Sequence, residues 1–164
     1  MLDVNLLRND LARVGAALAA RGVTGWMVEI GGEVRCAGTK DDGEPWMIGV
    51  EGPSEDGTRI AETVALVDAA LSTSGSYRRY VEQAGRITHH VFDPRTGHNA
   101  SNGIVTASIL APDCALADAL ATALMVLGPE RAESVFDRMG GGGLAGYFLE
   151  RASDGSLRTH KVRW

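Results

Sequence analysis

The chain has 164 residues, of which 45% are hydrophobic and 23% are charged, and its formal net charge is −5. This balance is typical of a soluble globular protein, and the length predicts a single domain over residues 1–164. The acidic balance argues against a nucleic-acid-binding function, because neutralising phosphates requires clustered lysine and arginine. We also expect no membrane span, because Asp118 interrupts the longest uncharged stretch, and the first ten residues lack the order of a signal peptide.

The first half of the chain predicts one helix followed by short strands. Leu7, Leu11, Val14 and Leu18 are three or four residues apart, which indicates one face of a helix that ends near Gly22. Strands should then flank a di-glycine turn, and the "STSGS" stretch should end the last of them. The expected strands are residues 24–30, 33–38, 44–53 and 62–70.

The second half predicts a hairpin, a strand, two helices and a final hairpin. Asp113 is a good N-cap for the first of these helices, which Gly128-Pro129 should close. Helices after a run of strands predict an α+β fold, with a mostly antiparallel sheet and helices packed on it. The expected elements are a hairpin over 77–94 turning near residues 84–85, a strand over 104–111, helices over 114–127 and 130–139, and strands over 144–150 and 157–162 turning at residues 154–155.

A helix over residues 114–127 would carry a polar pair opposite its apolar stripe. Asp118 and Thr122 are four residues apart, so one ligand could touch both side chains. A carboxylate and a hydroxyl suit Mg²⁺ or Ca²⁺, which prefer oxygen ligands, but two side chains do not define a site, and a solvated polar face explains the same pattern. The stripe expected to face the core is Leu116, Leu120, Ala123, Leu124 and Leu127.

The stretch "HHVFDPRTGHN", residues 89–99, concentrates groups that could do chemistry. On a strand, His90 and Phe92 would face one way and His89 and Val91 the other. Two histidines beside Asp93 suggest acid–base chemistry, since histidine titrates near neutral pH and a carboxylate can orient it. A structural histidine followed by a capped Pro-Arg-Thr-Gly turn is the alternative.

The two cysteines, Cys36 and Cys114, are far apart in the sequence and form no CxxC or Cys/His spacing. Two buried or half-buried free thiols are favoured over a disulfide, and a zinc site is not expected.

Five stretches, taken in order, resemble the C-terminal half of the FAD:protein FMN transferase family, formerly called thiamine biosynthesis lipoproteins. That family typically shows GGD, a TSGDY-like stretch, H-I-I-D-P-x-T-G and D-A-x-x-T, and the resemblance covers about residues 13–164. The stretches are "GGEVRCAG" (31–38), "PWMIGVEGP" (45–53), "TSGSYRRY" (73–80), "HHVFDPRTG" (89–97) and "ADALATALMVLG" (117–128).

The resemblance implies an activity and a set of site residues. Members of the family cleave FAD at its pyrophosphate, transfer the FMN half to a threonine of an acceptor protein and release AMP, with a divalent cation, usually Mg²⁺. Matched by position, the resemblance implies metal ligands at Asp118 and Thr122, transfer chemistry at His90 and Asp93, a loop against the flavin at Thr73, Ser74 and Gly75, and close approach to the nucleotide at Gly31 and Gly32.

Three departures qualify this expectation. Glu33 and Ser76 stand where the family usually has aspartate, and the A-K-G-Y-like motif expected just before residue 11 is not found. We therefore expect a truncated or split form, with a missing N-terminal half or a second copy as partner.

A flavin-binding relative without transferase activity and an interaction domain without ligand are the alternatives. Many members of the family lie at the cell envelope, but the compartment of this chain stays open, and a cytoplasmic location is compatible with its sequence.

Overall fold

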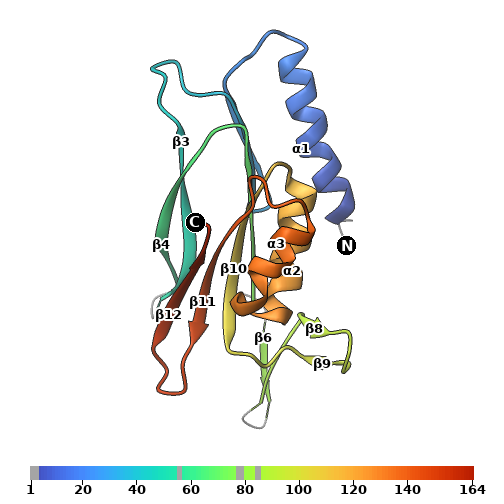
Figure 1. Ribbon diagram of the computed structural model, residues 1–164, viewed down its shortest axis with the longest axis vertical. Coiled ribbons are helices and arrows are strands. Elements are labelled where there is room, and N and C mark those ends of the chain that lie inside the picture. Colours follow the sequence, from blue (N-terminus) through green and yellow to red (C-terminus); the bar gives the residue numbers. More distant parts are fainter. Residues whose placement is uncertain (1–3, 55–56, 77–79, 84–85) are drawn as a thin grey trace. The chain divides into compact units, whose positions relative to one another are not determined.

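The computed structural model describes residues 4–54, 57–76, 80–83 and 86–164, without the side chains of residues 4–10 and 80–88. Its helices and strands, drawn in Figure 1, follow the predicted order of one helix, several strands, two helices and two strands. They are α1 (Val4–Ala19), β1 (Trp26–Ile30), β2 (Glu33–Ala37), β3 (Trp46–Ser54), β4 (Gly57–Leu66), β5 (Ala70–Gly75), β6 (Tyr80–Gln83), β7 (Arg86–His89), β8 (Phe92–Asp93), β9 (His98–Asn99), β10 (Ile104–Ala111), α2 (Cys114–Leu127), the 3-10 helix η1 (Pro129–Arg131), α3 (Ala132–Arg138), β11 (Ala145–Arg151) and β12 (Leu157–Val162).

The largest sheet has the strand order β1-β2-β5-β10-β11-β12, and β3-β4, β6-β7 and β8-β9 form three two-stranded sheets. The β1-β2, β2-β5 and β11-β12 pairs of the large sheet are antiparallel, as are all three small sheets. The predicted α+β class with a mostly antiparallel sheet is therefore confirmed. The turn expected at residues 84–85 lies outside the described residues.

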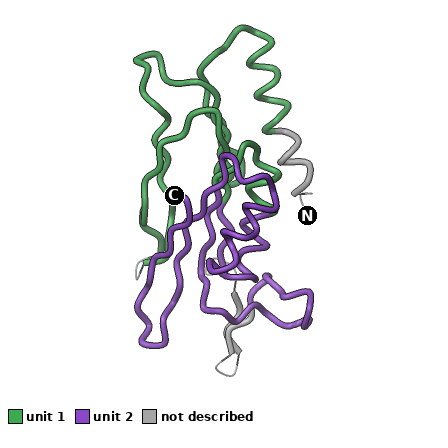
Figure 2. The backbone as a smooth tube through the Cα atoms, viewed as in Figure 1, with its two compact units in different colours: residues 1–72, 110–119 green, residues 73–109, 120–164 purple. Residues whose placement is uncertain are grey.

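The contacts divide the chain into two compact units, coloured separately in Figure 2. Unit 1 comprises residues 1–72 and 110–119, and unit 2 comprises residues 73–109 and 120–164. This division does not test the expectation of one domain over residues 1–164, which stays a prediction.

Unit 1 contains the predicted N-terminal helix and the first hairpin. The helix α1 ends at Ala19, and Gly22 follows with a φ of 78°, the left-handed conformation that commonly closes a helix. Gly31 and Gly32 have φ values of 68° and 92° and join β1 to β2 in a two-residue turn. Positive φ at both positions is the requirement of a type I′ hairpin, so local geometry alone explains this di-glycine.

The prediction that "STSGS" ends a strand is wrong. The strand β5 runs from Ala70 to Gly75, and β4 ends earlier, at Leu66. Ser72 is only 1% exposed, and the Thr73 and Ser108 hydroxyl oxygens are 2.8 Å apart, in hydrogen-bonding contact. Because short hydroxyl side chains find partners within the protein, this polar stretch continues as a strand rather than forming a loop.

Helix α2 has the predicted bounds and the predicted N-cap: Asp113 Oδ1 accepts a hydrogen bond from the Leu116 amide at 2.9 Å. Its burial differs from the predicted stripe, because the helix is buried over more of its circumference than one stripe covers. Of the five residues expected to face the core, Leu120 and Leu124 are buried, Leu116 and Leu127 are half-buried, and Ala123 is exposed. The helix also buries Cys114, Ala117, Asp118, Ala121 and Met125.

The C-terminal end of α2 is held by the side chain of Asn102. Asn102 Nδ2 donates to the carbonyl oxygens of Met125 (3.1 Å) and Val126 (3.2 Å), and its Oδ1 accepts from the Ile104 amide. The last carbonyl groups of a helix have no partners within the helix, so this asparagine satisfies two of them. It thereby connects the last turn of α2 to the start of β10.

The last elements follow the sequence closely. The helix expected over 130–139 is present as η1 and α3, and the final hairpin as β11 and β12. Arg163, just after β12, donates to the carboxylates of Glu133 and Asp137 and to the Gly141 carbonyl oxygen. These bonds connect the end of the chain to α3 and to the glycine run that follows it.

Both cysteines are buried free thiols, as predicted: Cys36 is 0% exposed and Cys114 is 5% exposed. The Cys114 thiol donates to the Val34 carbonyl oxygen at 3.6 Å. Burial raises the pKa of each thiol from 9.0 to about 11, because the thiolate loses its hydration. The thiolate is the reactive form of cysteine, so both groups should be inert in the folded chain.

We therefore expect 5,5′-dithiobis(2-nitrobenzoate) to label neither cysteine of the folded protein at pH 8, and to label both in denaturant. Because the folded pKa values are raised, the stability that these neutral thiols contribute is complete below pH 9 and is lost as the pH rises toward 11. Rapid labelling of two thiols per chain in native buffer would contradict the burial.

The Asn102 contacts predict that Asn102→Ala lowers the free energy of unfolding by about 0.5–1.5 kcal/mol, because the carbonyl groups at the end of α2 lose their donor. Urea denaturation followed by circular dichroism measures this change. Thr159→Ala, at an exposed position on β12, is the control and should change stability by less than about 0.5 kcal/mol. Equal stability of the two variants would show that the asparagine does not hold α2.

Candidate functional site

The polar pair predicted on α2 consists of one buried and one exposed side chain. Asp118 is 9% exposed, whereas Thr122 is exposed. The interpretation of both residues as a solvated face therefore does not hold for Asp118. Four residues apart on one helix, the two side chains project from the same side, one turn apart. Burying a carboxylate costs free energy unless the group is paired or hydrogen-bonded. The burial of Asp118 is therefore more unusual than the exposure of Thr122.

Thr122 is held by a residue of the strand β5. The Ser74 and Thr122 hydroxyl oxygens are 3.0 Å apart, in hydrogen-bonding contact, and either atom could be the donor. The preceding residue, Thr73, bonds instead to Ser108 of β10. Thr73, Ser74 and Gly75, expected as a loop, therefore lie on the strand β5, which brings Ser74 to α2.

The segment 89–91 is fixed by its backbone and by the imidazole of His89. His89 Nδ1 accepts from the Val91 amide at 3.3 Å, so its Nε2 carries the proton and donates to the Ala100 carbonyl oxygen at 3.2 Å. The Asn99 amide nitrogen donates to the carbonyl oxygens of His89 and Val91. With both ring nitrogens engaged, His89 has a structural role, as the alternative reading of this stretch proposed.

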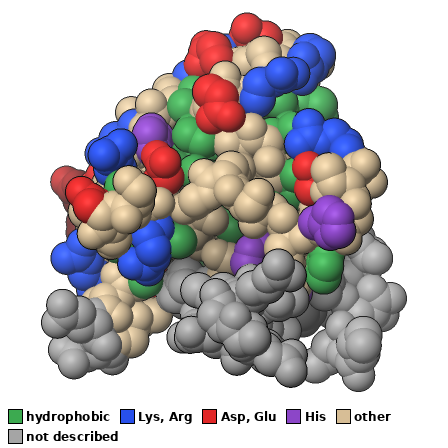
Figure 3. Space-filling model, turned by 90° about the horizontal axis from the view of Figure 1, so that it is seen from below, with side chains coloured by type: hydrophobic (Ala, Val, Ile, Leu, Met, Phe, Trp, Pro, Cys, Tyr) green, Lys and Arg blue, Asp and Glu red, His purple; other side chains and the backbone are tan. Residues whose placement is uncertain are grey.

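His90 differs from His89 in its exposure. Its side chain is exposed, as is that of Phe92, whereas Val91 is 3% exposed and His89 is half-buried. This is the alternation that the sequence predicted. The hydrogen bonds of the described residues engage His89 and leave the His90 imidazole unengaged. Figure 3 shows histidine side chains on a face where acidic and basic side chains are interspersed.

Asp93 forms a salt bridge within its own turn. Its carboxylate accepts from the Arg95 amide at 2.9 Å and from Arg95 Nε and Nη2 at 2.9 and 2.7 Å. The hydrogen bonds from the Arg95 guanidinium and amide lower the pKa of Asp93 below 3.8. A carboxylate engaged in this way stays ionised near neutral pH and is poorly suited to accept a proton. The capped-turn interpretation thus accounts for Asp93 and Arg95.

The structure brings together some of the predicted site residues. Ser74 and Thr122 are in direct contact, and Asp118 precedes Thr122 by one turn of α2. Gly31 and Gly32 lie in the β1–β2 turn, where a Cβ on Gly32 would meet open space. No hydrogen bond between described residues connects His90 to the Ser74–Thr122 pair. The Ser74–Thr122 contact could not be found from spacing, because 48 residues separate the two.

A hard cation is compatible with α2, but the described part of the chain does not complete a site for it. Within that part, no group of three or more His, Cys, Asp or Glu side chains is arranged to hold a metal ion. Asp118 and Thr122 supply a carboxylate and a hydroxyl, the oxygen donors that Mg²⁺ accepts, and Mg²⁺ commonly takes its remaining ligands from water and phosphate. The donor chemistry fits, and the ligands that the ion would still require could come from water, from a phosphate or from another segment.

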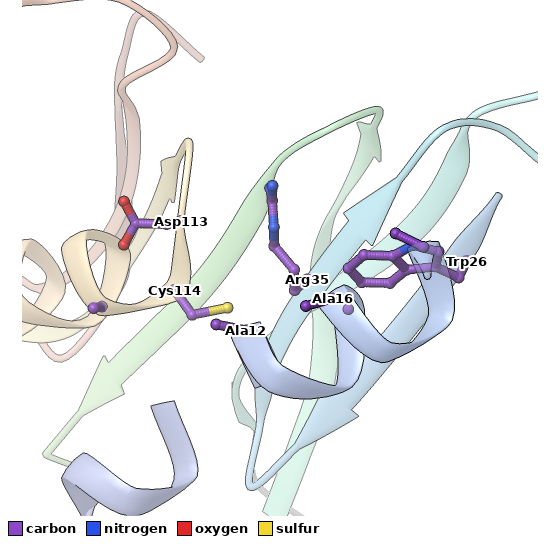
Figure 4. A pocket seen from close by; sticks show the side chains of 9 residues that line it. Ala12, Ala16, Trp26, Arg35, Asp113 and Cys114 are labelled. Carbon is purple, nitrogen blue, oxygen red and sulfur yellow. The ribbon is translucent and has the colours of Figure 1, made fainter. Parts of the chain in front are cut away.

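A separate cavity of about 430 Å³ lies in unit 1, between α1, β1, β2 and the start of α2 (Figure 4). Arg35 and Trp26 contribute its larger side chains, and Gly15 leaves room for the Trp26 ring, which a Cβ there would meet at 2.5 Å. None of the predicted site residues lines this cavity.

Among the described residues, no helix is both long enough and apolar enough to span a bilayer.

Comparisons with known proteins agree on one family. The model of the ApbE family matches residues 11–148, so the chain belongs to the ApbE family. It is 35% identical to a FAD:protein FMN transferase of Escherichia coli over 166 residues, covering 96% of this chain and 46% of that protein. It is 45% identical to a FAD:protein FMN transferase of Vibrio cholerae over 118 residues, covering 72% of this chain and 35% of that protein. These relatives are transferases by name.

Solved structures show the same fold. The chain is similar to the flavinyl transferase ApbE of Pseudomonas stutzeri in its apo form, with a TM-score of 0.73 and 36% identity, covering 92% of this chain and 45% of that one. The corresponding values for the ApbE protein of Thermotoga maritima are 0.69, 34%, 91% and 46%. The chain thus spans less than half the length of the relatives it matches.

The Asp93–Arg95 salt bridge predicts a measurable titration. In Arg95→Ala the pKa of Asp93 should rise toward 3.8, because the guanidinium bonds that favour the carboxylate are gone. In the wild type, whatever stability this bridge contributes is present above pH 3.8 and is lost as the pH falls through the lowered pKa. A carbon-13 NMR titration of the carboxyl groups measures the change. Asp154, whose pKa is lowered by Ser156, is the internal control and should not respond.

Proposed function

We propose that this chain takes part in cation-dependent transfer of FMN from FAD to a threonine of an acceptor protein, with release of AMP. Membership of the ApbE family and the names of the relatives support the flavin transfer. The requirement for Mg²⁺, the threonine acceptor, the AMP product and the site residues are part of the proposal. The observation that supports it best is the exposed hydroxyl of Thr122 one helical turn from the buried carboxylate of Asp118.

In this proposal Asp118 and Thr122 hold the cation, which neutralises the charge that builds on the phosphates during transfer. Burial of Asp118 restricts its motion and keeps water from it, so the carboxylate is held in place before the substrate arrives. Thr73, Ser74 and Gly75 of β5 lie beside the flavin, and Gly31 and Gly32 lie close to the nucleotide. Ser74 contacts α2 directly, which links the flavin side of the site to the cation side.

His90 is proposed as the group that accepts the proton of the acceptor threonine. Its exposure suits this role, because the acceptor is a second protein that must reach it from solvent. Engagement of both His89 nitrogens fixes the backbone from which His90 projects. Asp93 is proposed to act by shaping the turn, since its carboxylate is bonded to Arg95.

The chain covers 46% of its Escherichia coli relative, so the remaining ligands and FAD contacts are proposed to come from a partner segment or a second copy. A binding protein that retains flavin without transferring it is the second candidate. It is favoured by Ser76, which stands where the family's TSGDY-like stretch has a carboxylate.

Incubation with FAD, Mg²⁺ and a threonine-bearing acceptor tests the transfer. We expect flavin fluorescence on the denatured acceptor, reduced at least tenfold in His90→Ala and Asp118→Ala, because general-base and metal contributions are each typically at least this large. His98→Ala removes a second exposed imidazole of the same segment and should have little effect.

Three results are possible. Flavin retained without labelled acceptor supports the binding protein. Labelling that survives His90→Ala excludes this histidine as the base. Absence of flavin binding, even with Mg²⁺ at millimolar concentration, excludes both functions for the chain as it stands.

A further inference from the structure

The Ser74–Thr122 contact is a hydroxyl pair between a strand and a helix of unit 2. The two oxygen atoms are 3.0 Å apart. Ser74 is half-buried and Thr122 is exposed, so the pair lies at the edge of the packed interior with Thr122 on the solvent side. An ion arriving from solvent would reach Thr122 first, with Ser74 behind it.

A threonine in a helix usually satisfies its own hydroxyl. Its oxygen can bond back to the carbonyl group three or four residues earlier, which for Thr122 would be that of Asp118. In this structure the hydroxyl instead meets Ser74. The contact with β5 thus gives the Thr122 hydroxyl a partner outside its own helix.

The proton of a coordinating hydroxyl also requires a partner. A neutral hydroxyl that gives a lone pair to a cation keeps its hydrogen and donates it to an acceptor. Ser74 Oγ is at the distance of that acceptor. If Ser74 donated instead, its hydrogen would occupy a Thr122 lone pair and compete with the ion. Binding of a cation would therefore make Thr122 the donor and Ser74 the acceptor of this hydrogen bond. The Ser74 hydroxyl could then donate its own hydrogen to an acceptor on a ligand, such as a phosphate oxygen.

We propose that Ser74 is a positioning residue for a divalent cation at Thr122, holding the threonine hydroxyl and accepting its proton. This inference rests on the proposed function, which places the cation at Asp118 and Thr122. It assigns to Ser74 a role apart from contact with flavin. Partners that orient metal ligands commonly change metal affinity by 10- to 100-fold when they are removed.

Titration of the purified chain with Mn²⁺, followed by electron paramagnetic resonance of the free ion, tests the proposal without any transfer reaction. We expect Ser74→Ala to weaken Mn²⁺ binding about tenfold. Thr122→Ala should weaken it at least as much, and the double variant should bind no more weakly than Thr122→Ala alone, because Ser74 acts through Thr122. Ser74→Thr, which retains the hydroxyl, should keep most of the affinity.

Ser134→Ala is the matched control, since it removes an exposed hydroxyl bonded to the Arg131 carbonyl oxygen and should leave Mn²⁺ affinity unchanged. If Ser74→Ala does not fold, Ser74→Cys replaces it, because a thiol of similar size is only a weak acceptor and should also weaken binding.

Each outcome has one meaning. Wild-type Mn²⁺ affinity in Ser74→Ala overturns the role of Ser74. The same holds if Ser74→Ala weakens Mn²⁺ binding equally in the wild-type chain and in Thr122→Ala. A wild-type chain that binds no Mn²⁺ at millimolar concentration overturns both this inference and the cation part of the proposed function. If the chain binds Mn²⁺ and the effects of Ser74→Ala and Thr122→Ala are coupled as expected, the inference is supported. If the same chain transfers no flavin, only the transferase proposal fails.

Discussion

The placement of α2 is the constraint on which the candidate site depends. The helix is capped at its start by Asp113, and Asn102 bonds the carbonyl groups of its last turn. Between these ends it buries Leu120 and Leu124, so its rotation about its own axis is set by packing. Asp118 and Thr122 inherit that rotation. Neither has to find its position by side-chain ordering alone, which is the entropic advantage of building a site on a rigid helix.

Hydroxyl groups take the place of apolar packing where β5 meets its neighbours. A strand of small polar residues is a poor hydrophobic surface, yet Ser72 is almost completely buried and Thr73 bonds to Ser108. Pairing the hydroxyls offsets their desolvation, and their small size leaves room close to the backbone. The same property lets Ser74 reach α2.

The segment 89–99 separates structure from chemistry at adjacent positions. The ring nitrogens of His89 and the amide of Asn99 fix the backbone, while His90 projects to solvent. Asp93 and Arg95 neutralise each other in the turn that follows. The segment thus presents the exposed imidazole of His90 from a backbone that its neighbours hold in place. The two adjacent histidines differ because β7 ends at His89, whose ring is hydrogen-bonded within the segment, whereas His90 follows the strand with an exposed side chain.

The sequence by itself determined the class of the fold and the order of its elements. It also determined the hairpin turn at Gly31-Gly32, the helix N-cap at Asp113, and the alternation of exposure at His89 and His90. These follow from periodicity and from backbone preferences, which act over a few residues. Only the tertiary structure decided that residues 72–75 belong to a strand, that Asp118 is buried, and that Ser74 is hydrogen-bonded to Thr122. Burial and long-range hydrogen bonds depend on which elements pack together, and the spacing of residues along the chain does not predict that packing.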